Sequence, residues 1–276
     1  MMLDCETPAT TLFSLASAAG CSTDLIRDAV YSYRELDFAD THDEMWVTVP
    51  RDLLARARVD ITDVQFGGAY YFHGTRVLDP TTFVEHGIRP LGAAIDAIWL
   101  DLHQLCADRV TDNEWKAIRR DVEGGAAGCN SHAAWLYRFK LSDSTQHGPF
   151  GSMIRRHALH PQEHFHDYLA APEIIEDIAA FTDIGLLNAF KKASRSCAVE
   201  YRLTESVSQK AVEAAVLHLL EDLQGTSFGI GSYWGDNREG VAVPASDVIY
   251  VDELRRGGSR FDTDAWLRHP GQAIAN

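Results

Sequence analysis

Tyr70-Tyr71-Phe72-His73-Gly74-Thr75-Arg76 is the stretch on which the prediction of the fold rests. Its aromatic residues favour a β-strand, and Asp79-Pro80 beyond it favours the start of a helix. A polar side chain where a strand ends is held rigidly by the sheet behind it, while the main chain beside it is free to bind a ligand. A glycine next to the histidine lets a flat ring approach the backbone. We therefore expect a binding site at this end of the strand.

A second region of interest lies far downstream. Asn237-Arg238-Glu239 precedes an apolar segment, 240–243, and a second one, 247–251, which we predict to be two short strands joined by a Pro-Ala-Ser turn. The segment 225–235 before them contains four glycines and several aromatic residues, which predicts a mobile loop with side chains available to a partner.

The two regions together resemble ADP-ribosyltransferases of the histidine-tyrosine-glutamate type. His73-Gly74-Thr75 resembles the family's His-Gly-Thr motif, and Phe83-Val84-Glu85-His86-Gly87-Ile88 resembles the helix and Gly-Ile turn that follow it. Glu239 lies at the start of a predicted strand pair, which is similar to the place of the family's catalytic glutamate. The resemblance implies an α+β fold with a split antiparallel sheet surrounded by helices. It also implies transfer of ADP-ribose from NAD to a macromolecular acceptor, either protein or nucleic acid.

The chemistry of that reaction explains the residue types. Breaking the bond between nicotinamide and ribose develops positive charge on the sugar, which a carboxylate stabilises. By the resemblance, Glu239 takes this role, His73 binds the ribose, and Gly74 and Thr75 bind the rest of the dinucleotide. Tyr137, which lies between His73 and Glu239 in the chain, is the expected ring that stacks on nicotinamide. The residues expected to touch the acceptor are Tyr233, Trp234 and Asn237.

Composition limits the other classes of function. The chain has 276 residues, 46% of them hydrophobic, and is long enough to bury a sizeable core. We predict a helical N-terminal segment (1–59), a transferase-like body (60–256) and a peripheral tail (257–276). The net charge of -15 disfavours broad binding of duplex DNA, which depends on many lysine and arginine contacts to phosphate. A toxin or defence role with a neutralising partner protein is implied by the resemblance alone.

Local patterns predict several elements and a location. Helices are expected at 10–20, 23–33 and 206–222, the last capped by Ser206, and a strand at 45–49. No apolar run reaches the roughly 18 residues of a membrane span, and the N-terminus lacks the positive region of a signal peptide, so we expect a cytoplasmic protein. The five cysteines form no Cys-x-x-Cys pair, which argues against a disulfide framework and a thiolate zinc site.

Three alternatives stay open at the level of sequence. His157, His160, His164 and His166 form a cluster that could bind zinc in a metal-dependent hydrolase, although Pro161 interrupts a continuous helix. Cys129 follows a Gly-rich stretch and could be a thiol nucleophile at a helix N-terminus. The chain could also be a catalytically inactive binding module of the transferase fold.

Overall fold

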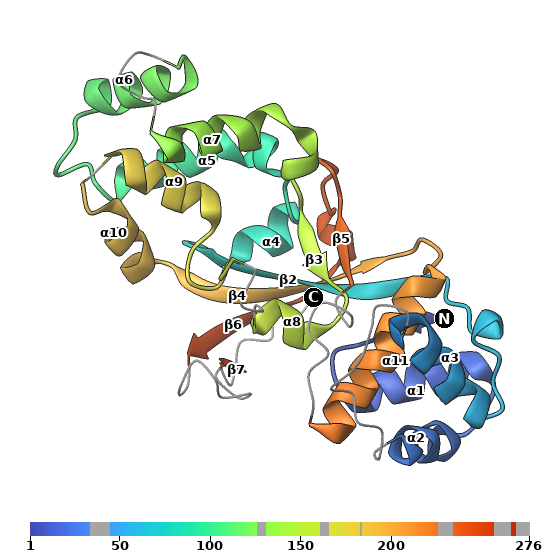
Figure 1. The fold of residues 1–276 in the computed structure, drawn as a ribbon. Coiled ribbons are helices and arrows are strands. Elements are labelled where there is room, and N and C mark those ends of the chain that lie inside the picture. Colours follow the sequence, from blue (N-terminus) through green and yellow to red (C-terminus); the bar gives the residue numbers. More distant parts are fainter. Residues whose placement is uncertain are drawn as a thin grey trace. The chain divides into compact units, whose positions relative to one another are not determined.

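The computed structural model describes residues 1–33, 45–125, 131–160, 166–182, 184–225, 234–256 and 266–268. These residues combine helices with one seven-stranded sheet (Figure 1), which confirms the predicted mixed α+β class. Among them, no helix has both the length and the apolar character needed to cross a membrane.

The sheet has the strand order β5-β3-β2-β4-β6-β7, and β1 pairs with β2 outside this path. β1 runs parallel to β2, whereas β3 pairs antiparallel with β2 through Phe72 and Ser152, and β7 pairs antiparallel with β6. The strands are β1 (Met2–Leu3), β2 (Gly68–Val77), β3 (Phe150–Ser152), β4 (Arg195–Leu203), β5 (Gly235–Asn237), β6 (Val248–Arg256) and β7 (Trp266–Arg268).

The chain divides into two compact units. Unit 1 comprises 1–72, 151–158 and 201–236, and unit 2 comprises 73–150, 159–200 and 237–276. Each unit therefore collects segments that are distant in the sequence, whereas the predicted division was linear. The predicted helical segment 1–59 lies entirely in unit 1, together with part of the predicted transferase body.

Unit 1 is built around α11, whose residues 211–221 are all buried. The helices α1, α2 and α3 pack against it or against one another (Figure 1), which buries the apolar stripe expected in 206–222. The cap of α11 is Ser208 and not Ser206, because the Ser208 side chain accepts a hydrogen bond from the Ala211 amide. The helices are α1 (Pro8–Ala19), α2 (Thr23–Ser32), α3 (Met45–Arg56), α8 (Arg155–Leu159) and α11 (Gln209–Gln224), with the 3-10 turn η2 (Ile61–Asp63).

The predicted strand at 45–49 is wrong, because these residues form the first part of α3. Val47, Thr48 and Val49 favour a strand locally, yet α3 packs on α11 and α2, and tertiary packing overrides a weak propensity. Pro50 lies inside the helix and removes a single backbone hydrogen bond.

Unit 2 contains a helical core centred on Trp99. Its indole contacts the rings of Trp115 and Phe181, with centroids 4.9 and 6.2 Å away. A capping box between Thr111 and Glu114 starts one of the surrounding helices. The helices are α4 (Thr81–His86), α5 (Leu91–Gln104), α6 (Asp112–Glu123), α7 (His132–Ser142), α9 (Glu173–Thr182) and α10 (Leu186–Ala193), with the 3-10 turns η3 (Ser144–Gln146) and η5 (Ala245–Asp247).

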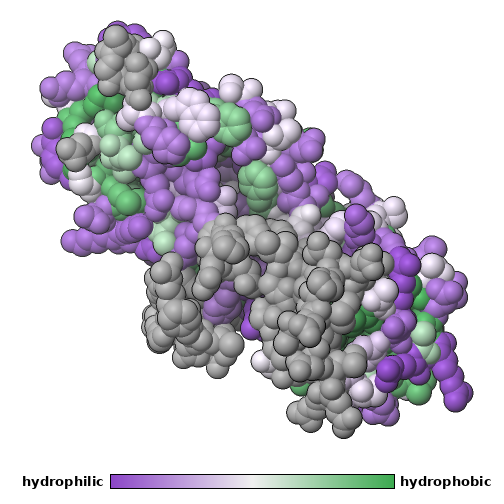
Figure 2. All heavy atoms as spheres, viewed as in Figure 1, coloured by the Kyte–Doolittle hydropathy of each residue, from purple (hydrophilic) through white to green (hydrophobic). Residues whose placement is uncertain are grey.

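The surface of the described residues is mainly hydrophilic on the face drawn in Figure 2, with separate hydrophobic patches. This distribution agrees with a chain that carries 40 acidic and 25 basic residues. Several large hydrophobic side chains are nevertheless exposed, among them Leu100, Trp135, Phe150 and Val241.

Candidate functional site

His73 lies within β2 and not at the end of the strand as expected, because β2 continues to Val77. Its half-buried ring is held in one tautomer. Its Nδ1 is 2.7 Å from the carbonyl oxygen of Phe150, and a carbonyl can only accept, so Nδ1 carries the proton. Burial lowers the pKa of His73, which keeps the ring neutral near pH 7. Nε2 is then a hydrogen-bond acceptor, and no described residue bonds to it. His73 is therefore prepared to accept a hydrogen bond from a ligand hydroxyl group.

The residues after His73 anchor the end of the strand within unit 2. Thr75 is buried, and the guanidinium of Arg76 donates to the hydroxyl groups of Ser194 and Ser196, each at 2.7 Å, and to the Lys191 carbonyl. An arginine with several fixed acceptors restricts the backbone on which it stands. His73 therefore lies on a strand whose following residues are held firmly in place.

The two regions of the sequence that carry the resemblance meet in unit 2. Ile88 and Val243 exchange backbone hydrogen bonds of 2.9 and 3.0 Å in an isolated antiparallel bridge. Gly87 makes this approach possible, because its φ is 72° and an added Cβ would lie 2.0 Å from the Val243 carbonyl oxygen. Glycine is thus required at the Gly-Ile turn by a contact with the downstream region.

Glu239 lies in a turn and not at the start of a strand, so the predicted strand at 240–243 is wrong. Its φ of 48° is left-handed, which is uncommon for a residue with a side chain. Asn237 supports this conformation because its Oδ1 accepts from the Glu239 amide at 3.0 Å. The Glu239 side chain is exposed, and no described residue pairs with its carboxylate.

Residues 148–150 connect His73 to the Glu239 turn. The Phe150 carbonyl accepts from His73, the Pro149 carbonyl from the Arg238 amide at 3.2 Å, and the Gly148 carbonyl from the Gly240 amide at 2.9 Å. Two candidate residues from opposite ends of the chain are therefore attached to the same three-residue segment. The arrangement offers a neutral imidazole that can accept a hydrogen bond from a hydroxyl group, and an unpaired carboxylate that can stabilise a positive charge.

Sequence reasoning missed the segment that makes this connection. Its only local signal is Gly148-Pro149, which predicts a turn but no site. The contribution of 148–150 comes from backbone carbonyls, which every residue has, so no pattern of side chains could have identified it.

Tyr137 is a core residue of unit 2. Its ring is fully buried against Trp99 and Phe181, and its hydroxyl accepts from the Trp99 indole at 2.8 Å and donates to Glu123 at 3.1 Å. Burial raises the pKa of Tyr137. A ring with both faces covered cannot stack on a ligand, so we do not include Tyr137 in the candidate site.

The three residues expected to touch an acceptor lie in different environments or outside the described residues. Tyr233 lies outside the described residues. Trp234 is half-buried in unit 1, where its carbonyl accepts from the Met153 amide at 2.9 Å. The side-chain amide of Asn237 is engaged at both ends, since Nδ2 donates to the Thr145 carbonyl at 2.7 Å and Oδ1 accepts from Glu239. Asn237 is therefore part of the support of the turn.

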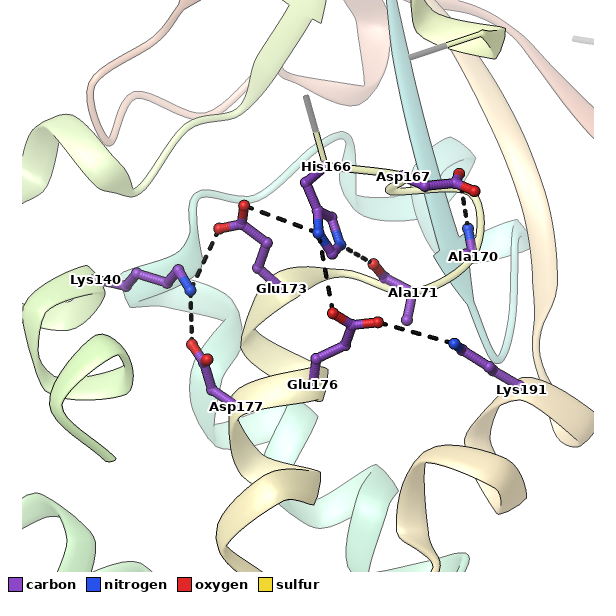
Figure 3. A network of polar contacts seen from close by, with 9 residues as sticks. All are labelled: Lys140, His166, Asp167, Ala170, Ala171, Glu173, Glu176, Asp177 and Lys191. Atoms are coloured by element: carbon purple, nitrogen blue, oxygen red, sulfur yellow. Dashed lines mark hydrogen bonds and ion pairs between the residues drawn. The ribbon is translucent and has the colours of Figure 1, made fainter. Parts of the chain in front are cut away.

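The histidine cluster is divided among separate environments. His157 is buried in unit 1, with its ring 6.1 Å from that of His218 on α11. His166 faces the Ala171 carbonyl and lies 3.9 to 4.0 Å from carboxylate oxygens of Glu173 and Glu176 (Figure 3). His164 lies outside the described residues, and within these no group of three or more His, Cys, Asp or Glu residues could hold a metal ion.

Cys129, the candidate thiol nucleophile, also lies outside the described residues. The described cysteines are free, and Cys5, Cys106 and Cys197 are buried. Burial raises the pKa of Cys5 and of Cys197 to about 12, so both remain protonated thiols near neutral pH.

Comparison with known proteins adds no family: no family model matches the chain, and no curated protein or solved structure matches it. The site must therefore be interpreted from its own chemistry.

Proposed function

We propose that the protein transfers ADP-ribose from NAD to a macromolecular acceptor, on a divergent ADP-ribosyltransferase-type sheet. The observation that carries the proposal is the attachment of His73 and of the Glu239 turn to one segment, 148–150. Motifs that resemble one family in sequence are thereby brought to the same part of unit 2, as a shared site requires.

The geometry supports a distinct role for each residue. Nε2 of His73 accepts a hydrogen bond from a ribose hydroxyl group, while the backbone of Gly74 binds the carboxamide. As the bond between ribose and nicotinamide breaks, the nicotinamide leaves with the bonding electron pair, and the Glu239 carboxylate stabilises the positive charge on the sugar. The acceptor then forms the new bond to the same carbon and loses a proton.

The direct test is nicotinamide release from NAD by the purified protein, with cell extract as the source of acceptors. We expect His73→Asn and Glu239→Gln each to lower the rate about 10²- to 10³-fold, because each removes an interaction with the reacting sugar. Asp24→Ala, which removes a carboxylate whose side chain is 74% exposed in unit 1, is the matched control and should keep the rate. Thermal unfolding of each variant establishes that it is folded.

The class of acceptor follows from the same experiment with NAD labelled in the adenosine. Label that protease releases from the macromolecular fraction indicates a protein acceptor, and label that nuclease releases indicates nucleic acid. An active wild type whose Glu239→Gln variant keeps its full rate would refute the assigned chemistry. A folded wild type that neither binds nor consumes NAD would refute the transferase and favour a binding module.

A further inference from the structure

The left-handed φ of Glu239 belongs to a β-turn, 238–241, which the Val241 amide closes by donating to the Arg238 carbonyl at 2.8 Å. Two described residues other than glycine have a left-handed φ, namely Arg58 at 60° and Glu239 at 48°. Arg58 follows the end of α3, where its amide bonds to Ala55 and the next amide bonds to Leu54. A left-handed residue is the ordinary way to end a helix, so Arg58 is explained. Glu239 instead follows the strand β5 and, with Gly240 at a φ of 91°, forms the two central positions of a type I′ turn, where a glutamate is less usual than Gly, Asn or Asp.

A chain of hydrogen bonds from outside the turn supports this conformation. The Asp143 carboxylate accepts from the amide and hydroxyl of Thr145, at 2.9 and 2.7 Å, which orients that residue. The Thr145 carbonyl accepts from Asn237 Nδ2, and Asn237 Oδ1 in turn accepts from the Glu239 amide. The orientation of η3 is thus transmitted through one side chain to the backbone of Glu239.

The far side of the turn is fixed independently. The Gly240 amide donates to the Gly148 carbonyl, and the Arg238 amide donates to the Pro149 carbonyl. Glu239 is therefore the residue between two backbone attachments, and Asn237 supplies the contact to its own amide. The side chain of Glu239 is exposed, so that a ligand can reach its carboxylate.

From this geometry we infer that Asn237 is a positioning residue for Glu239, and that the chain Asp143–Thr145–Asn237 presents the Glu239 carboxylate to the bound dinucleotide. This inference rests on the proposed function for its catalytic consequence. It replaces the expectation that Asn237 contacts the acceptor, because both ends of its amide already bond within the protein. A strained residue held by its surroundings is a common feature of functional sites.

The kinetic test compares Asn237→Ala with wild type in the nicotinamide release assay. We expect kcat to fall about 10- to 100-fold while KM for NAD changes less than about twofold, because a misplaced carboxylate loses charge stabilisation in the transition state more than ground-state binding. Asn188→Ala, which removes an exposed asparagine of α10, is the matched control and should leave both constants unchanged. A raised KM for the acceptor at unchanged kcat would overturn the inference and restore the acceptor role.

Amide hydrogen exchange tests the positioning without any requirement for activity. We expect exchange at the Glu239 amide to become about fivefold faster in Asn237→Ala, because its acceptor is lost. In Asn237→Asp an Oδ1 acceptor remains, so the Glu239 amide should keep its protection. Unchanged exchange in Asn237→Ala would overturn the inference even in an active enzyme. Absence of NAD turnover in wild type would refute the proposed function, while the exchange result would still decide whether Asn237 holds the turn.

Discussion

The Glu239 turn and the contact between α7 and α9 differ in whether their charged side chains are paired. Along α9, Asp177 pairs with Lys140, Glu173 with Lys140 and His166, and Glu176 with His166 and Lys191 (Figure 3). In the turn, the backbone of Glu239 is fixed, yet no described residue pairs with its carboxylate.

Under the proposed function, this difference separates the structural role of the α7–α9 pairs from the catalytic role of Glu239. Paired charges between two helices are explained by the packing that they accompany. A carboxylate that is exposed and unpaired on a fixed turn is available to a ligand, as the proposed function requires. Breaking the α7–α9 pairs should therefore lower the free energy of unfolding and spare activity, and altering Glu239 should do the reverse.

The largest effect on stability is expected from Lys140→Met. The Lys140 Nζ is 2.6 Å from Asp177 Oδ2, and the two side chains are only 12% and 8% exposed. Loss of the cation leaves a buried carboxylate without its partner, so we expect the free energy of unfolding in urea to fall by about 3–5 kcal/mol. The double variant Lys140→Met/Asp177→Leu should regain most of this loss. Nicotinamide release per folded molecule should be unchanged, and its loss would contradict the division of roles.

A second, smaller effect concerns two buried histidines of unit 1, His157 and His218. Burial, with Arg156 nearby, lowers the pKa of His157 to about 4 and of His218 to about 3. The unfolded chain binds protons below its ordinary histidine pKa of about 6.5, whereas the folded chain does not until about pH 4. Stability is therefore complete above pH 6.5 and decreases as the pH falls, by on the order of 3 kcal/mol for each histidine at pH 4.

Urea unfolding between pH 7.5 and 4.5 measures this dependence. We expect His157→Gln and His218→Gln each to flatten the decrease in the free energy of unfolding. His86→Gln, at an exposed histidine of α4, should leave the slope unchanged. A slope that is the same in all four proteins would show that the buried pair does not govern acid stability.

The smallest effect on stability is expected from Glu239→Gly. This variant should become slightly more stable while it loses activity. Glycine adopts the left-handed conformation without steric cost, so we expect a gain of about 1 kcal/mol in the free energy of unfolding. Arg58→Gly is the matched control, since it relieves a φ of 60° in unit 1 and should be stabilised by a similar amount. Only Glu239→Gly should lose nicotinamide release. Equal activity in the two variants would mean that the turn is structural.

Much of the local structure could be predicted because its signals are local. The aromatic run at 70–76 lies in β2, and α2 begins at Thr23 as predicted, with Ser22 as its cap. The predicted strands at 45–49 and 240–243 were wrong because neighbours distant in the sequence override local preference. Packing on α11 favours a helix in the first case, and hydrogen bonds to 148–149 favour a turn in the second.

The sequence indicated which residues of the candidate site have reactive side chains, but not which other residues surround them. His73 and Glu239 stand out because an imidazole and a carboxylate have specific chemistry. Tyr137 and Asn237 could not be assigned correctly, because a tyrosine ring packs equally well in a core and an amide bonds equally well to protein or ligand. Their roles depend on which atoms surround them.

By itself, the sequence determined the α+β class, the β2 strand, the main helices and the residues with reactive chemistry, since periodicity, capping and residue type are local properties. Only the tertiary structure decided that residues 148–150 join His73 to the Glu239 turn, that Asn237 supports the turn, and that Tyr137 is buried. These outcomes depend on backbone hydrogen bonds and packing between segments far apart in the chain, which no local pattern encodes.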